Sequence, residues 1–210
     1  MPTLTTALQI TLATVLALGL VAGAERTQHL ELRVVPAPGP VAIDGALEDW
    51  DTSGAILLCN DLAAGTDRRS ARASAMYDAE ALYLGLAVRD ATPLRNPTPR
   101  DRATVGWRGD CLQMRLRLPQ AEGADRILFL DAWRTHPGGD RAAWLQFPGS
   151  DRAPVDLLAG DGALAFTRAA DGGGYVQELR IPWDALGLAD RVAPGLAFGL
   201  GLEVVGGAHG

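Results

Sequence analysis

The segment Cys111-Leu112-Gln113-Met114-Arg115-Leu116-Arg117-Leu118 alternates between two chemical characters at every residue. Its even-numbered residues are all apolar, whereas its odd-numbered residues carry a thiol, an amide and two guanidinium groups. Because successive side chains of a β-strand point to opposite faces, this period of two predicts a strand with one buried and one polar face. An amphipathic helix would need apolar residues at a spacing of about 3.6, which the segment lacks.

Similar segments occupy most of the chain after residue 25 and predict the fold class. Clusters rich in Gly, Pro and Asp separate them, as turns between short strands do. Only Trp183–Leu186 and Glu48–Ser53 are expected to be helical, and both are short. The sequence therefore predicts an all-β fold: a single β-sandwich of about eight to eleven mostly antiparallel strands with short helical turns. The further strands are expected at 29–35, 71–77, 82–88, 126–133, 142–147, 163–168, 175–181 and 196–205.

The composition excludes several classes of function. The chain has 210 residues, of which 25 are acidic and 19 basic, giving a formal net charge of −6. Such a chain is poorly suited to coat a phosphate backbone, so we expect no nucleic-acid partner. Every basic residue is Arg, which removes Lys nucleophiles and the Lys of a phosphate-binding loop. The sequence also lacks the short motifs of serine hydrolases, zinc proteases and dinucleotide-binding enzymes, so we expect binding without catalysis.

Residues 1–24 have the features of a secretory signal peptide. An apolar run from Ala7 ends in Ala22-Gly23-Ala24, a small-residue cleavage pattern. An uncleaved anchor is the alternative, but the most apolar part, Ile10–Ala24, is shorter than the roughly 20 residues that span a bilayer. We expect a protein that is secreted or held in the periplasm or cell envelope, with no membrane span after cleavage.

Export of the protein would leave residues 25–210 as the mature chain and would place its two cysteines in an oxidising compartment. Residues 25–40 would form an N-terminal strand and a Pro-rich hinge, and residues 41–210 would form the sandwich. In an oxidising compartment Cys59 and Cys111 could form a disulfide, and closing that loop would stabilise the fold by roughly 4 kcal/mol. Two unpaired thiols are the alternative, since the sequence does not show whether their Cα atoms lie close enough.

Four local patterns, taken in order, resemble carbohydrate-binding module family 9 and the wider DOMON-like group of β-sandwich domains. They are IDGALEDW at 43–50, MYD…ALYL at 76–84, WRGDCLQ at 107–113 and GYVQELRIPW at 174–183. The resemblance implies a β-sandwich and a noncatalytic domain whose partner is a polysaccharide or an oligosaccharide. Within these patterns, Trp50 and Trp183 are expected to be core residues that close the ends of the sandwich.

Recognition of a sugar requires a flat aromatic surface and groups that bind pairs of hydroxyls. Trp107 and Trp144 are expected to form this aromatic platform, and Trp133 is a further candidate. The polar contacts are expected from three residues on polar strand faces: Gln113, Arg115 and Glu178. A solvated outer face and packed Trp side chains are the structural alternatives.

Calcium and haem are the cofactors to consider. The resemblance implies calcium in some modules, and Asp44, Glu48 and Asp49 supply oxygen donors of the type that calcium prefers. Some DOMON-like domains hold haem between Met and a second ligand, for which Met76 or Met114 with His136 would be required here. An electron-transfer domain is therefore the alternative function, together with a structural or adhesion sandwich that binds no small ligand.

Overall fold

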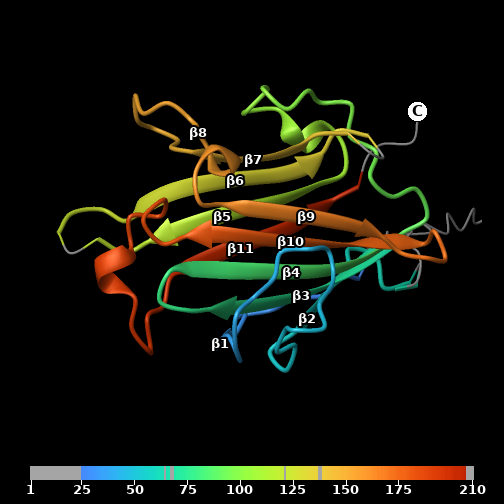
Figure 1. The fold of residues 1–210 in the computed structure, drawn as a ribbon, viewed down its shortest axis with the longest axis horizontal. Coiled ribbons are helices and arrows are strands. Elements are labelled where there is room, and N and C mark those ends of the chain that lie inside the picture. The colour runs from blue at the N-terminus through green and yellow to red at the C-terminus, as the bar shows by residue number, and fades with distance from the viewer. Residues whose placement is uncertain (1–24, 64, 67–68, 121, 137–138, 207–210) are drawn as a thin grey trace, which may run out of the picture.

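We describe a computed structural model of the chain, which covers residues 25–63, 65–66, 69–120, 122–136 and 139–206. The signal peptide predicted at residues 1–24 lies outside the described residues. The described chain folds into two β-sheets packed face to face, as predicted from the alternation (Figure 1). None of the described helices is long and apolar enough to cross a membrane.

The first sheet contains six strands in the order β1-β3-β4-β10-β9, with β2 also paired to β3. Only the pairing of β1 with β3 is parallel, and every other pairing in either sheet is antiparallel. The strands of this sheet are β1 (Val34–Pro36), β2 (Ile56–Leu58), β3 (Arg69–Tyr77), β4 (Ala81–Asp90), β9 (Ala163–Arg168) and β10 (Gly174–Pro182).

The second sheet contains five strands in the order β11-β5-β6-β7-β8. Two edges bound it, β11 on one side and the two-residue β8 on the other. The strands are β5 (Cys111–Leu118), β6 (Arg126–Arg134), β7 (Arg141–Gln146), β8 (Val155–Asp156) and β11 (Gly199–Val205). Strand β5 has the bounds predicted from its alternation, and its four apolar residues are at most 1% exposed.

Short strands and turns are where the sequence prediction fails. The strand expected at 29–35 is reduced to the three residues of β1, and β2 and β8 were not predicted. Trp183–Leu186 and Glu48–Ser53 form turns rather than helices. Gly187, at a φ of 63°, follows the first of these segments and ends it after about one turn. Within the described ranges, the helical pieces are instead three 3-10 helices: η1 (Gly106–Arg108), η2 (Leu157–Ala159) and η3 (Ala189–Arg191).

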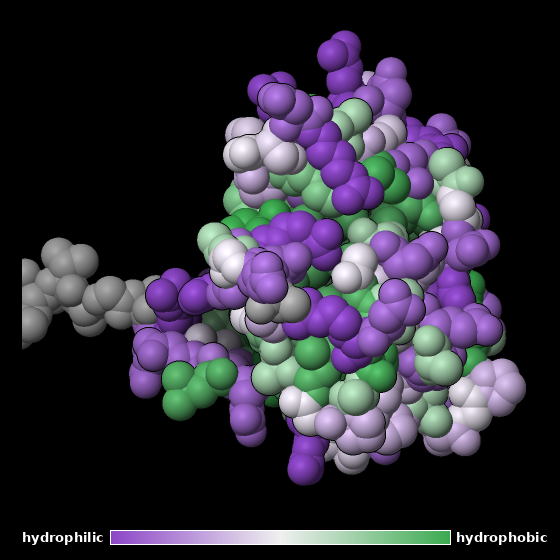
Figure 2. Space-filling view, turned by 90° about the vertical axis from the view of Figure 1, so that its left-hand side faces the viewer, coloured by the Kyte–Doolittle hydropathy of each residue, from purple (hydrophilic) through white to green (hydrophobic). Residues whose placement is uncertain are grey.

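The core lies between the sheets and consists mainly of Leu side chains from the inward faces of β4, β5 and β6. Each Leu that is fully buried contributes roughly 1.5–3 kcal/mol relative to an exposed one. Seen from one end of the sandwich, polar side chains project over most of the surface, and apolar side chains show between them in small separate patches (Figure 2).

A second apolar cluster covers the outer face of the first sheet. Residues 37–55 cross this face and pack Trp50 against Met76 and Tyr83. The ring of Trp50 lies on Gly85, where any Cβ would come within 2.9 Å of the ring. Trp50 and Trp183 are 7% and 3% exposed, which confirms that both are packed. Trp50, however, packs on the outer face of the first sheet and does not close an end of the sandwich as predicted. This crossing segment leaves the outer face of the second sheet as the open one.

Candidate functional site

The open outer face of the second sheet carries a row of side chains that spans all five strands. The register places Glu203 of β11, Gln113 of β5, Asp131 of β6, Trp144 of β7 and Asp156 of β8 opposite one another in turn. With neighbouring strands about 4.8 Å apart, the four intervals give a row roughly 19 Å long. A second row beside it contains Arg115, Phe129 and Gln146. We call these two rows the open face.

Asp131 organises the polar part of the open face. Its carboxylate is only 2% exposed and accepts hydrogen bonds from Gln113 Nε2 at 2.9 Å and from Gln146 Nε2 at 3.0 Å. Arg115 Nη1 lies 3.7 Å from the same carboxylate. Both amides therefore donate inward and are held in place, which leaves their carbonyl oxygens available to accept hydrogen bonds from a ligand.

Two aromatic side chains flank this polar centre. The guanidinium of Arg115 stacks 4.2 Å from the centroid of the Phe129 ring, an arrangement that fixes the direction of the charge. Trp144 is partly exposed, and its indole Nε1 donates to the carbonyl oxygen of Arg100 at 2.7 Å. This hydrogen bond holds the edge of the ring, so the orientation of the Trp144 face is fixed before any ligand binds.

Trp107 lies at the margin of the open face. It belongs to η1, which rests against β5 and β6, and it is 50% exposed, an unusual value for Trp. The guanidinium of Arg108 lies 5.6 Å from its ring centroid. An exposed ring beside a sheet face can supply an additional stacking surface.

Trp133 does not contribute a surface to the open face. It is 0% exposed because the loop before β5 covers it: Gly106 lies on the ring, and Trp133 Nε1 donates to the carbonyl of Thr98 at 3.0 Å. Asn96, also fully buried, fixes this loop by donating to the Gly106 and Asp110 carbonyls. The candidate contact from Trp133 would require the loop to open.

Glu178 lies on the other sheet from the remaining candidates. It is 0% exposed on the outer face of β10, under the crossing segment. One carboxylate oxygen accepts from Trp50 Nε1 at 2.7 Å, and the other accepts from the backbone N–H of Gly45. Burial raises the pKa of this carboxyl group, and these two hydrogen bonds oppose the rise. Glu178 therefore holds the crossing segment on the sheet.

The structure thus brings together Gln113, Arg115 and Trp144 from the predicted set, with Trp107 nearby. It adds three residues that the sequence analysis did not single out: Phe129, Asp131 and Gln146. Their position could have been found by extending the alternation of β5 to β6 and β7, because residues of one parity share a face. The hairpin registers that align them could not be read from the sequence.

The acidic residues considered for calcium do not gather. Asp44 Oδ1 accepts from Ala46 N at 3.0 Å and Asp49 Oδ2 from Ala42 N at 2.7 Å, so each closes a local turn. Glu48 is exposed beside them. Across the described ranges, no three His, Cys, Asp or Glu side chains are grouped in a way that could hold a metal ion. The calcium hypothesis thus gains no site from the structure.

The residues considered for haem lie in different layers of the fold. Met76 belongs to the cluster outside the first sheet, whereas Met114 lies between the sheets. His136 lies in the β6–β7 turn, and its backbone N–H donates to the Asn96 carbonyl. Met114 pairs with Leu130, and β6 extends roughly 13 Å from there to its end at Arg134. Met114 and His136 are therefore too far apart to ligate one iron from opposite sides.

Both cysteines are free and buried, so the disulfide considered above is not formed in this structure. Cys111 lies on the outer face of the second sheet with Trp133, and Cys59 follows β2 of the first sheet, where its thiol donates to the Arg69 carbonyl. Burial raises the pKa of the Cys111 thiol well above its usual range, and the negative charge of Asp131 adds to the rise. The Cys111 thiol is therefore expected to be unreactive in the folded protein.

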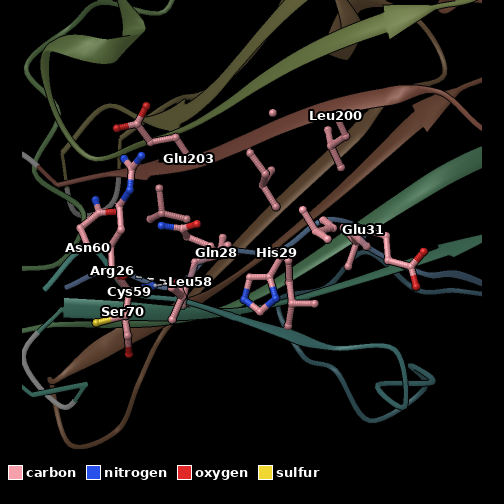
Figure 3. Close-up of a pocket in the computed structure, with 18 of the residues that line it drawn as sticks. Arg26, Gln28, His29, Glu31, Leu58, Cys59, Asn60, Ser70, Leu200 and Glu203 are labelled. Atoms are coloured by element: carbon pink, nitrogen blue, oxygen red, sulfur yellow. Dashed lines mark hydrogen bonds between the residues drawn. The ribbon is translucent and has the colours of Figure 1, made fainter. Parts of the chain in front are cut away.

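A cavity of about 1310 Å³ lies along the edge of the sandwich rather than on the open face. Residues 26–34 line one side of it and residues 195–206 the other (Figure 3). Leu200 and Leu202 of β11 point toward the interior but remain partly exposed there. The sandwich is therefore incompletely closed beside β11.

Comparison with known proteins assigns no family to the chain. No protein-family model matches the chain, and no curated protein is significantly similar to it. The fold is a β-sandwich in which residues 37–55 cover the outer face of the first sheet and the outer face of the second sheet is open.

Proposed function

We propose that this protein is a noncatalytic carbohydrate-binding module of an exported protein and that it holds a saccharide on the open face. One observation carries the proposal: two amides are fixed by the buried carboxylate of Asp131 between the Trp144 ring and the Arg115–Phe129 stack. These contacts hold the amides and the guanidinium in place, so less conformational entropy is lost when a ligand binds.

The chemistry of this arrangement matches the two sides of a sugar ring. The partly exposed ring of Trp144 offers an apolar surface to the C–H groups of a pyranose. The free carbonyl oxygens of Gln113 and Gln146 accept from hydroxyls, and the guanidinium of Arg115 donates to ring or hydroxyl oxygens. The row is roughly 19 Å long, which is enough for several consecutive sugar units and therefore favours a polysaccharide over a monosaccharide.

Affinity gel electrophoresis of the mature domain against a panel of soluble polysaccharides tests the proposal. We expect retardation by at least one polymer, and we expect Gln113→Ala and Gln146→Ala each to weaken binding about fivefold to tenfold, because each removes roughly 1–1.5 kcal/mol of hydrogen bonding. Trp144→Ala should abolish binding, since the stacking surface is lost.

Arg115→Ala removes the guanidinium donor and should also weaken binding, and Arg72→Ala is its matched control. Arg72 is an exposed residue of β3 in the first sheet, so the same change is made away from the open face. Binding that survives Trp144→Ala, Gln113→Ala and Arg115→Ala in folded protein would place any sugar site elsewhere. A folded wild-type domain that is not retarded by any polymer would refute the proposed function.

The unclosed edge beside β11 favours a second candidate, a structural sandwich that pairs with an extended strand of a partner protein. Strand β11 is paired on one side only, by β5, and such an edge is a template for strand addition. Leu202→Lys would place a charge in the cavity and block such a strand without touching the open face. Loss of assembly in this variant, with glycan binding absent from the wild type, would favour the structural role.

A further inference from the structure

A second cavity, of about 610 Å³, lies where the β6–β7 turn approaches β9. Segments far apart in the sequence form its walls, and three of its side chains are guanidinium groups. The lining residues are Ile43, Asp44, Arg100, Arg134, Gly139, Asp140, Arg141, Leu158, Ala165 and Phe166. We call this the arginine cavity.

Two of the arginines face each other directly. Arg134 and Arg141 are paired across β6 and β7, on the inward side of the second sheet. Like charges at directly opposite positions of an antiparallel pair repel, so the fold holds them together at a cost. Among the described residues, neither is within 4.0 Å of a carboxylate oxygen, as an ion pair would require.

The hydrogen bonds of this pair use only part of their donors. Arg141 Nη1 donates to the Leu164 carbonyl at 2.6 Å, and Arg134 Nε donates to the Gly139 carbonyl at 3.4 Å. Each guanidinium has five N–H donors in a planar fork. The remaining donors of both groups are available at the cavity, in the geometry that binds carboxylate, sulfate and phosphate oxygens in pairs.

The two acidic residues of the lining do not neutralise the pair. Asp44 uses Oδ1 to accept from Ala46 N, and neither it nor Asp140 forms an ion pair with the three arginines. Arg100 is paired instead with Asp156, outside the lining, at 2.6 Å. Asp156 balances Arg100, so the local groups are three positive and three negative, and Arg134 and Arg141 are the two arginines of the lining for which the described residues provide no ion-pair partner.

Arg100 connects the cavity to the open face. Its carbonyl accepts the indole N–H of Trp144, and its partner Asp156 is the residue opposite Trp144 in the row. Arg100 therefore lies between Trp144, on the outer face of the second sheet, and the arginine cavity, whose Arg134 and Arg141 lie on the inward side of that sheet. This connection relates the positive charge to the same ligand.

We propose that the arginine cavity binds an acidic group of a polysaccharide, a carboxylate or a sulfate, on the sugar unit next to the one stacked on Trp144. The inference rests on the proposed function and specifies its ligand class: an acidic glycan rather than a neutral one. Arg134 and Arg141 hold the anion, and Arg100 borders it. Sodium chloride should weaken this binding, because the contact is between charges that solvent can reach.

Affinity electrophoresis with paired polymers tests the inference. Polygalacturonate and the same polymer with its carboxyl groups reduced differ only in the acid, and dextran sulfate against dextran does the same for sulfate. We expect at least one acidic polymer to bind about tenfold or more tightly than its neutral counterpart, and we expect Arg134→Gln/Arg141→Gln to remove that difference.

Arg33→Gln/Arg72→Gln is the matched control, since it removes the same charge from two exposed arginines on or just before strands of the first sheet. The thermal midpoint of each variant establishes folding, and Arg141→Lys preserves the charge if the double variant does not fold. Equal binding of acidic and neutral polymers would overturn the inference and leave the proposed function standing. A preference for acid that survives Arg134→Gln/Arg141→Gln would also overturn it, whereas binding of neither kind of polymer would refute the proposed function as well.

Discussion

Replacing Glu178 tests how the crossing segment is held on the first sheet. Glu178→Ala leaves two buried donors, the Gly45 N–H and the Trp50 indole N–H, without an acceptor. Each unsatisfied donor costs about 1–3 kcal/mol, and removal of a buried carboxylate returns part of that cost. We expect a net loss of about 3 kcal/mol in the free energy of unfolding.

For a chain of this length, that loss corresponds to a fall in Tm of about 6–12 °C. Urea unfolding followed by Trp fluorescence measures it, and an unchanged m-value would show that the unfolded state is not altered. Glu80→Ala is the matched control, because Glu80 forms an exposed ion pair with Arg180 and should contribute less than about 1 kcal/mol. A loss below about 0.5 kcal/mol for Glu178→Ala would refute the role assigned to this carboxylate.

The same residue gives a pH dependence with a defined sign. Burial raises the pKa of Glu178 in the folded protein, so the folded state binds a proton more readily than the unfolded state does. Its contribution to stability is fully present below the unfolded pKa, about 4.3, and is lost as the pH rises through the folded pKa. Glu178→Gln should remove this slope, and the difference between wild type and variant isolates it from the other carboxylates. Identical slopes in the two proteins would contradict the raised pKa.

One substitution and one chemical probe test the packing of buried side chains. Gly106→Ala would place a Cβ 2.5 Å from the Trp133 ring, so it should lower the free energy of unfolding by about 1–3 kcal/mol and shift Trp fluorescence to the red. Gly160→Ala, with open space at its Cβ, is the control and should cost less. Equal losses in the two variants would contradict the packing of Gly106 on the ring. Both thiols should resist a thiol reagent in native protein, because Cys59 and Cys111 are 3% and 1% exposed, and two thiols per chain should react after unfolding without reductant. Fewer than two would indicate a disulfide.

The residues that form the candidate site were predictable in part. The alternation of β5 placed Gln113 and Arg115 on one polar face, and the structure confirms that placement. The sequence did not reveal Asp131 as the centre of the polar cluster, because a buried carboxylate is recognised only by its partners. Those partners come from β5 and β7 and depend on two hairpin registers.

Glu178 shows the limit of interpreting faces from alternation. The second half of strand β10 alternates as β5 does, with Glu178 and Arg180 on one face and Leu179 and Ile181 on the other. In the folded protein that polar face is buried, because residues 37–55 cross it and Trp50 packs onto Gly85. A polar face of a strand can therefore be solvated or covered, and local sequence does not distinguish the two.

The sequence by itself determined the all-β fold and the inward face of its central strands, because a period of two and frequent turns permit few other ways to bury the apolar side chains. Only the tertiary structure decided which sheet stays open, which Trp rings are accessible and where the arginines of the β6–β7 hairpin meet. Those features depend on contacts between residues far apart in the chain, such as Glu178 with Trp50 and Trp144 with Arg100. These contacts form only when distant segments pack together, so no local sequence pattern predicts them.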